Sequence, residues 1–592
     1  MPPAPLESRL SANIFLHVPP LPPRQSLLRS TPTEKKEEAE ERDRDREKGR
    51  KKSKRTLVFF IPGNPGLVGY YRPFLTLVAR GLRGAERQIG HEGGDGNQDS
   101  ERGERRAAAV VVAGMSLGGF DVDEEPPRSG KNDDNDVDDN NKSKRKNGEE
   151  EQGEERHCDD HEWNEDEVRD GDGNVISSSP GPRCSILAED RELLYPPSFR
   201  LRSRHGQRHK DRGNADRKEN GRTAGEQHKI YPLREQIELS YARMEYLVQR
   251  LQQERSLVGN ISKQQEPVEV VLVGHSVGAY IALEIVRLWH ERRHHHQHPQ
   301  QPPPPLGPSR TVDFDGKDDD DTPSSILDSP KTRNGLLSSP SWSISTCILL
   351  TPTIQDIHLS PSGQIATPLL RYLPFLPGLA HMLLHAILLR LLPSAWFSWL
   401  VSGATGMEKT SHGFETTMAF LRSKRGVKQA LFMARGEMNE IRRDKWGEEV
   451  WGASHSGAWT AEDDHGRSAK SPRLFFWFAK KDHWIANVTK EAIFDSRAAD
   501  VGVQRERVTG PRSSSESVET EEEFMGQDQD SKKTTGAARI QILETEAMVH
   551  AWCLNQSEYV ARRVSGWLME VLDENHRPLL RNGRSSPKGH ND

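Results

Sequence analysis

The most constraining feature of this sequence is the segment 266–289, EPVEVVLVGHSVGAYIALEIVRLW. An apolar, β-branched run from Val268 to Val273 enters the pentapeptide Gly274-His275-Ser276-Val277-Gly278, and an apolar face at helical spacing follows it. A strand, a sharp turn and a helix in this order predict a nucleophile elbow, in which a strained turn lifts Ser276 out of the backbone. Glycines on both sides suit such a turn, because no Cβ atom has to fit beside the serine.

A second turn follows the strand that we expect at Leu57 to Ile61. The sequence Pro62-Gly63-Asn64-Pro65-Gly66 then precedes an apolar helical run. A turn at this place supplies the second backbone donor of the oxyanion hole in hydrolases that have a nucleophile elbow. Proline has no N–H, so we predict an oxyanion hole formed by the amides of Asn64 and Val277. A turn without any catalytic role is the alternative.

Asp482 and His550 follow Ser276 in the order nucleophile, acid, base. Asp482 lies just after a predicted strand, Leu474 to Ala479, and His550 lies beyond another, Arg539 to Leu543. Active sites of open α/β sheets lie at the carboxyl ends of the strands. A serine needs an imidazole to remove its proton, and a carboxylate holds that imidazole in the correct tautomer. The sequence therefore predicts an α/β-hydrolase fold with a Ser276–Asp482–His550 triad.

Four other residues compete for these roles. Ser116 lies in a second Gly-x-Ser-x-Gly pattern, but the polar sequence after it cannot form the helix that an elbow needs. Asp356 follows a further predicted strand and is an alternative acid. His483 is a weaker candidate for the base, because side chains adjacent on a turn point apart. His275 is expected to pack beside the nucleophile without a catalytic role.

Long polar tracts interrupt the apolar segments. Only 33% of the residues are hydrophobic and 29% are charged. We expect disorder in these tracts, which are residues 1–54, about 84–106, 121–229, 290–342 and 500–538, and 575–592. Without them roughly 300 residues remain, enough for one buried domain. The predicted architecture is a single domain at 55–574, with a mostly parallel sheet flanked by helices.

Composition also excludes several kinds of partner. The net charge of −6 is small for 592 residues and argues against a nucleic-acid-binding protein. The cluster His157-Cys158-Asp159-Asp160-His161 lies in a polar tract where nothing fixes a metal geometry. We therefore predict no metal and no cofactor. Four scattered cysteines fit reduced thiols in the cytosol better than a disulfide framework.

One segment, 368–401, is far more apolar than the rest of the chain. Three prolines interrupt it: Pro374, Pro377 and Pro393. The uninterrupted helix, about Gly378 to Leu392, is shorter than the ~20 residues that span a bilayer. The segment, within about 365–403, forms either a lid over the active site or a helical hairpin in a membrane or lipid-monolayer interface. The second is favoured because the helix is apolar around most of its circumference, with Trp396, Phe397 and Trp399 as interfacial anchors.

The same segments resemble the lipid droplet-associated hydrolases, a branch of the α/β-hydrolase superfamily. The similar pieces are IPGNPG with Tyr70-Tyr71, GHSVGAYIALEI, LTPTIQDIHLSPSG, KKDHWIAN and HAWCLNQSEYVA. The resemblance implies serine-type carboxylic ester hydrolysis and the same triad. It also implies targeting to lipid droplets and the endoplasmic reticulum, with the apolar segment as the anchor. The long insertions and the second Gly-x-Ser-x-Gly pattern depart from the family.

Two functions follow. In the first, the protein hydrolyses lipid esters, sterol esters or acylglycerols, on the cytoplasmic face of droplets or the endoplasmic reticulum, and Ser276 is the nucleophile. In the second, it binds droplets and acts by interaction, with the hydrolase fold mainly as a scaffold. A complete triad favours the first, since a protein that has lost its activity need not keep all three residues.

Overall fold

A computed structural model describes most of the apolar segments and part of the polar ones. The described residues are 6–19, 55–88, 110–120, 122, 183–200, 229–258, 267–297, 342–452, 471–496, 503–508 and 540–576. The chain divides into two units, Met1–Val122 with Glu192–Asp592, and Asp123–Arg191. Of the second unit the structure describes only the beginning of helix α3 (Arg183–Leu194). The cluster His157–His161 and the tail after His576 lie outside the described residues.

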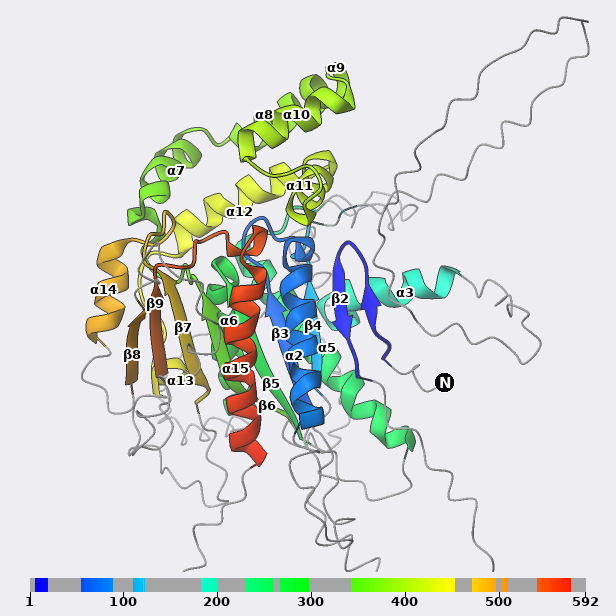
Figure 1. Ribbon diagram of the computed structural model, residues 1–592, viewed down its shortest axis with the longest axis vertical. Coiled ribbons are helices and arrows are strands. Elements are labelled where there is room, and N and C mark those ends of the chain that lie inside the picture. Colours follow the sequence, from blue (N-terminus) through cyan, green and yellow to red (C-terminus); the bar gives the residue numbers. More distant parts are fainter. Residues whose placement is uncertain are drawn as a thin grey trace, which may run out of the picture. The chain divides into compact units, whose positions relative to one another are not determined.

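A nine-stranded, mostly parallel sheet forms the centre of the first unit (Figure 1). Its order is β1-β2-β4-β3-β5-β6-β7-β9-β8. The strands are β1 (Arg9–Leu10), β2 (Ile14–His17), β3 (Arg55–Ile61), β4 (Val110–Met115), β5 (Val268–His275), β6 (Trp342–Leu350), β7 (Arg473–Ala479), β8 (Val503–Val508) and β9 (Ile540–Thr545). The pairs β1–β2 and β2–β4 are antiparallel and the other pairs are parallel.

The strand order places a topological switch point between β3 and β5. The chain passes from β3 outward to β4, then returns past β3 to β5 and continues outward in the opposite direction. Every residue of β3 and of β5 is buried, which explains their almost continuous apolar sequences. Crevices for ligands form at the carboxyl ends of strands at such a point. The turn after β3 and the pentapeptide after β5 therefore meet there.

Helices cover both faces of this sheet. Phe475 and Trp477 of β7 contact Trp567 of α15 (Ser557–His576), with ring centroids 5.1 and 5.6 Å apart. Phe476, between them, stacks on Trp451 of α13 (Glu448–Trp451) at 5.9 Å. Successive side chains of a strand point to opposite faces, so α15 and α13 lie on opposite sides. Helix α2 (Arg72–Gln88) packs beside α15 (Figure 1), and α5 (Leu233–Val258) contacts α6 (Val277–Gln297).

A helical segment lies between β6 and β7, above the carboxyl ends of the strands in Figure 1. Its elements are α7 (Pro361–Tyr372), α8 (Leu376–Met382), the π-helical turn η5 (Leu383–Leu388), α9 (Leu389–Leu391), α10 (Ser394–Thr405), α11 (His412–Arg422) and α12 (Gly426–Glu440). A small core of its own holds α10 and α11 against η5, and it consists of Leu384, Phe397, Val401, Phe414 and Met418. The predicted helix at 378–392 is thus present, but a π turn divides it.

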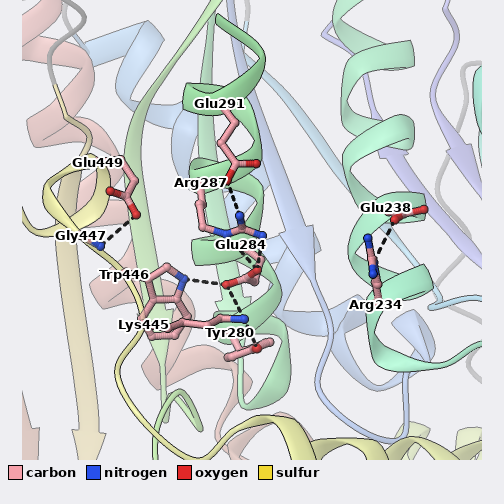
Figure 2. Close-up of polar contacts among 10 residues, drawn as sticks. All are labelled: Arg234, Glu238, Tyr280, Glu284, Arg287, Glu291, Lys445, Trp446, Gly447 and Glu449. Carbon is pink, nitrogen blue, oxygen red and sulfur yellow. Dashed lines mark hydrogen bonds and ion pairs between the residues drawn. The ribbon is translucent and has the colours of Figure 1, made fainter. Parts of the chain in front are cut away.

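The connection from α12 to α13 is tied to α6 through the buried carboxylate of Glu284 (Figure 2). Glu284 accepts from Trp446 Nε1 at 2.8 Å and pairs with Lys445 Nζ at 3.1 Å. Arg287 Nη2 lies 3.0 Å from the other oxygen, and Lys445 also donates to the Tyr280 hydroxyl at 2.6 Å. A buried carboxylate needs this many partners. The cluster therefore fixes the chain after α12 relative to the helix that follows the pentapeptide.

Several tracts that we expected to be disordered contain ordered elements. Residues 1–54 include β1 and β2, and residues 500–538 include β8. Residues 121–229 include α3, with the buried side chain of Leu193, and, after this helix, the buried side chain of Phe199. Helix α2 also extends into the tract at about 84–106, as far as Gln88, and helix α6 extends into the tract at 290–342, as far as Gln297. Short edge strands next to prolines and charges leave little pattern in a sequence. Cys347 and Cys553 are free and buried.

Candidate active site

The pentapeptide after β5 forms the strained turn that its glycines predict. Ser276 has a φ of 54°, a left-handed conformation that is rare for a residue with a side chain. A Cβ atom at Gly274 would lie 2.5 Å from the carbonyl oxygen of Gly278, and one at Gly278 would lie 2.2 Å from that of Ile61. Neither position has room for alanine. Strain held by such packing is typical of a functional residue.

The structure brings Ser276, Asp482 and His550 together from three strand ends. His550 Nε2 lies 3.0 Å from Ser276 Oγ, and His550 Nδ1 lies 2.8 Å from Asp482 Oδ2. The second oxygen, Asp482 Oδ1, accepts from the backbone N–H of Trp484 at 2.7 Å. Because a carboxylate only accepts, Nδ1 carries the proton and Nε2 is free to accept from the serine hydroxyl. The side chain of Asp482 is 2% exposed and that of His550 is 15% exposed.

His275, inside the pentapeptide, makes two hydrogen bonds that fix its tautomer. Its Nε2 lies 2.8 Å from the carbonyl oxygen of His550, which can only accept, so Nε2 carries the proton. Its Nδ1 therefore accepts from the hydroxyl of Tyr71 at 2.7 Å. That hydroxyl accepts from the N–H of Gly63 at 3.1 Å. One buried chain of hydrogen bonds thus joins the turn after β3 to the backbone of the candidate base.

Burial keeps both members of this chain neutral. Desolvation, followed by the nearby charge of His550, lowers the pKa of His275 to about 3. Desolvation, the largest cause, raises the pKa of Tyr71 well above its ordinary value. Neutral Tyr71 and neutral His275 therefore hold the backbone of His550 and the turn after β3 by hydrogen bonds, without placing a charge beside Ser276.

The turn after β3 lies directly against the candidate nucleophile. A Cβ atom at Gly63 would lie 2.9 Å from Ser276 Cβ. The Gly63 amide already donates to Tyr71, so the next amide, that of Asn64, is the first in the turn left as a candidate oxyanion donor. Val277 is the first residue of α6, and the first N–H groups of a helix have no acceptor within the helix.

The rival residues take other roles. Ser116 is fully buried, its Oγ accepts from the N–H of Val68 at 3.1 Å, and its carbonyl accepts from Arg243 Nη1 at 2.6 Å. Asp356 precedes a short 3-10 turn with a φ of 47°, and the carbonyl of His483 accepts from Ser362 at 2.8 Å. Within the described part of the chain, no hydrogen bond joins any of these three to Ser276.

Sequence reasoning missed two residues that contact the site. Tyr71 belongs to a pair of tyrosines after the turn, but nothing in the pattern assigned it a hydrogen bond. Glu437 lies on the buried face of α12 and accepts from Asn64 Nδ2 at 3.0 Å. Glu437 lies four residues after the buried Met433 and eight after the buried Gln429. This helical spacing was the one sequence signal that could have placed the acid on the buried face. Among the described residues, no group of three or more histidine, cysteine or acidic side chains could hold a metal ion.

The geometry of this site can be set beside a comparison with protein families. The family model described as lipid-droplet associated hydrolase matches residues 54–148 and 204–513, which is most of the chain. The match includes the turn with Asn64, the pentapeptide with Ser276 and the strand end with Asp482. It ends before His550.

Proposed function

Because the chain belongs to the lipid-droplet associated hydrolase family, we propose that it is a serine carboxylic ester hydrolase of the α/β-hydrolase fold. Its substrates are lipid esters, sterol esters or acylglycerols, at lipid droplets and the endoplasmic reticulum. The observation that carries this proposal is the hydrogen-bonded chain from Ser276 Oγ through His550 to Asp482, with distances of 3.0 and 2.8 Å. Ser276 itself lies in a strained turn, and this turn lies at the switch point of the sheet.

Each residue has a defined step in this reaction. Ser276 Oγ attacks the ester carbonyl while His550 Nε2 takes its proton, and Asp482 stabilises the imidazolium that forms. The amides of Asn64 and Val277 donate to the oxyanion, and losing one such donor typically costs about 3 kcal/mol of transition-state stabilisation. His550 then protonates the leaving alcohol. Water attacks the acyl-enzyme with the same base and releases the carboxylic acid.

The outer face of the helical segment supports contact with a lipid surface. Large apolar side chains are exposed along α7 to α10; they include Ile365, Tyr372, Phe375, Met382, Leu391, Trp396 and Trp399, each more than half exposed. So many exposed large apolar side chains within one segment are typical of a surface that contacts a partner or a lipid. Within the described residues no single helix could cross a membrane. Among the helices that the structure describes, one pair, Pro361–Tyr372 with Leu376–Leu391, bent by 93°, reaches the required length and hydropathy together. Because these apolar side chains are exposed, we propose that 368–401 lies in the droplet monolayer or the membrane interface on its cytoplasmic face.

Labelling with a fluorophosphonate tests the nucleophile. The wild-type protein and Ser116→Ala should be labelled, and Ser276→Ala should not, while its circular dichroism stays that of the wild type. Labelling that persists in Ser276→Ala and disappears in Ser116→Ala would show that the nucleophile is misassigned. Absence of labelling in the wild type, with no turnover of any acyl ester, would favour the alternative of a droplet-binding scaffold.

Droplet binding is tested separately from catalysis. Trp396 and Trp399 are each 68% exposed, so replacing both with glutamine removes interfacial anchors without opening the core. The double variant should leave the droplet fraction in flotation experiments and keep its fluorophosphonate labelling. Removing 368–401 should release the protein as well. Unchanged localisation of both variants would exclude this segment as the anchor.

A further inference from the structure

Glu437 of α12 is a buried acid without a cation to compensate it. Its side chain is among the buried charged groups, at 5% exposure. No lysine, arginine or histidine in the described part of the chain forms an ion pair with it; its recorded side-chain partner is Asn64. Burial of an unpaired carboxylate is strongly unfavourable. A residue of this kind beside an active site therefore calls for an explanation in terms of its one partner.

That partner belongs to the candidate oxyanion turn. Asn64 Nδ2 donates to Glu437 Oε1 and to the carbonyl oxygen of Ala430, each at 3.0 Å. Both acceptors are on α12, one and a half to two turns apart along the helix. Asn64 Oδ1 is buried and has no hydrogen-bond partner among the described residues. The side-chain amide of Asn64 is thus held by two hydrogen bonds from its nitrogen, whereas its oxygen has no hydrogen-bond donor among the described residues.

Helix α12 is itself held at both ends. Near its start, Gln429 exchanges two hydrogen bonds with the backbone of Tyr231, at 2.9 and 2.8 Å. Just after its end, the carbonyl of Ile441 accepts from the N–H of Ile357, and the cluster around Glu284 anchors the chain that follows (Figure 2). A helix fixed in this way provides a rigid support for the Asn64 side chain.

The protonation state of Glu437 complements the free oxygen of Asn64. Desolvation by burial raises its pKa to about 7, and the hydrogen bond from Asn64 opposes this rise. No charged side chain of α5, α7, α8, α11 or the 3-10 helix η4 (Ile357–Leu359, with His358), the elements that contact α12, perturbs its pKa. A protonated carboxyl accepts through one oxygen and donates through the other. It can therefore satisfy both ends of an amide, whereas a carboxylate has no proton to offer Asn64 Oδ1.

We propose that Glu437 is a positioning residue that fixes the side chain of Asn64 and thereby the backbone amide that donates to the oxyanion. The inference rests on the proposed function. It gives a role to an uncompensated acid on the buried face of α12. It also links the helical segment to catalysis, because a shift of α12 would move the turn that lies against Ser276. The neutral acid is the competent form, so the rate should fall as Glu437 loses its proton.

The test compares three variants in the hydrolysis of p-nitrophenyl butyrate between pH 6 and pH 9. Glu437→Met removes the hydrogen bond and should lower kcat about 100-fold, the loss typical of one oxyanion donor, with KM within about twofold. Glu437→Gln keeps an acceptor and a donor, as the neutral acid does, and should retain the wild-type kcat at pH 6. Glu440→Gln, on the same helix and exposed, is the matched control and should match the wild type throughout.

The pH profile separates positioning from a merely structural role. The ratio of wild-type kcat to Glu437→Gln kcat should fall as the pH rises through about 7. A constant ratio, or equal kcat values for Glu437→Met and the wild type, would overturn the inference while the hydrolase function stands. Turnover that survives in Ser276→Ala would instead overturn the proposed function. If Glu437→Met does not fold, the pH dependence of the kcat ratio between the wild type and Glu437→Gln still tests the inference.

Discussion

Replacement of His275 by glutamine should make the protein less sensitive to acid. In the native structure His275 donates from Nε2 to the carbonyl of His550 at 2.8 Å, and it accepts at Nδ1 from Tyr71. Protonation of Nδ1 would break the second bond and place a charge in a buried site. Desolvation by burial, followed by the nearby charge of His550, lowers the pKa of His275 from 6.5 to about 3. Glutamine places an amide N–H near the position of Nε2 and cannot be protonated.

The sign and size follow from proton linkage. The unfolded chain binds a proton at His275 near its ordinary pKa and the folded chain does not, so stability is full above about pH 6.5 and is lost as the pH falls toward 3. One pKa unit corresponds to about 1.4 kcal/mol. At pH 5, about 1.5 units below the ordinary value, the free energy of unfolding of the wild type should therefore be reduced by about 2 kcal/mol through this residue alone.

Urea unfolding at pH 7.5 and at pH 5 measures this effect. Between the two pH values the wild type should lose about 2 kcal/mol more stability than His275→Gln. All other histidines contribute equally to both proteins, so only the difference in pH dependence matters, whatever the stability of the variant at pH 7.5. His483→Gln, at an exposed position, is the control and should follow the wild type. An equal loss for the wild type and His275→Gln would refute the assigned tautomer and its burial.

Three further predictions concern the turn, the acid and the hydrogen-bond chain. Asp482→Asn should reduce kcat for p-nitrophenyl butyrate by about 10⁴-fold with little change in KM, because the amide favours the wrong tautomer of the base; a loss below tenfold would exclude the assigned role. Gly278→Ala should prevent folding, measured by thermal denaturation, since its Cβ would lie 2.2 Å from the carbonyl oxygen of Ile61; Gly378→Ala, with open space around it, should not lower Tm. Tyr71→Phe leaves the Gly63 amide and His275 Nδ1 without a partner. It should lower the free energy of unfolding, measured in urea, by about 1–3 kcal/mol. An unchanged value would show that the two hydrogen bonds of this hydroxyl do not stabilise the fold.

Local sequence patterns predict those parts of the site that local structure determines. The β-branched run before Ser276 and the apolar face after it specify a strand and a helix, and the glycines specify the turn between them. Asp482 and His550 were found for a related reason, because each follows a buried apolar strand. Parallel strands end at one edge of the sheet, so residues at such ends meet whatever their distance in sequence.

Contacts between distant segments explain what the sequence did not predict. Glu437 meets Asn64 only because α12 packs against the turn after β3, and no periodicity within α12 reveals that neighbour. Strand β2 is ordered because Ile14, Phe15 and Leu16 are buried beside β4. In the sequence it is a short run of apolar residues between a charged segment and prolines. Tertiary pairing overrides such weak local signals.

The parallel direction of the sheet also determines where the chain tolerates changes in length. Five tracts outside the described residues leave from the end of a helix and return at the start of a strand: 89–109 before β4, 259–266 before β5, 298–341 before β6, 453–470 before β7 and 497–502 before β8. All five therefore join the fold at the amino-terminal edge of the sheet, whereas Ser276, Asp482 and His550 lie beyond the carboxyl-terminal edge. Changes in the length of these tracts, and fluorophores or affinity tags introduced there, would therefore enter the fold at the edge opposite to the candidate active site.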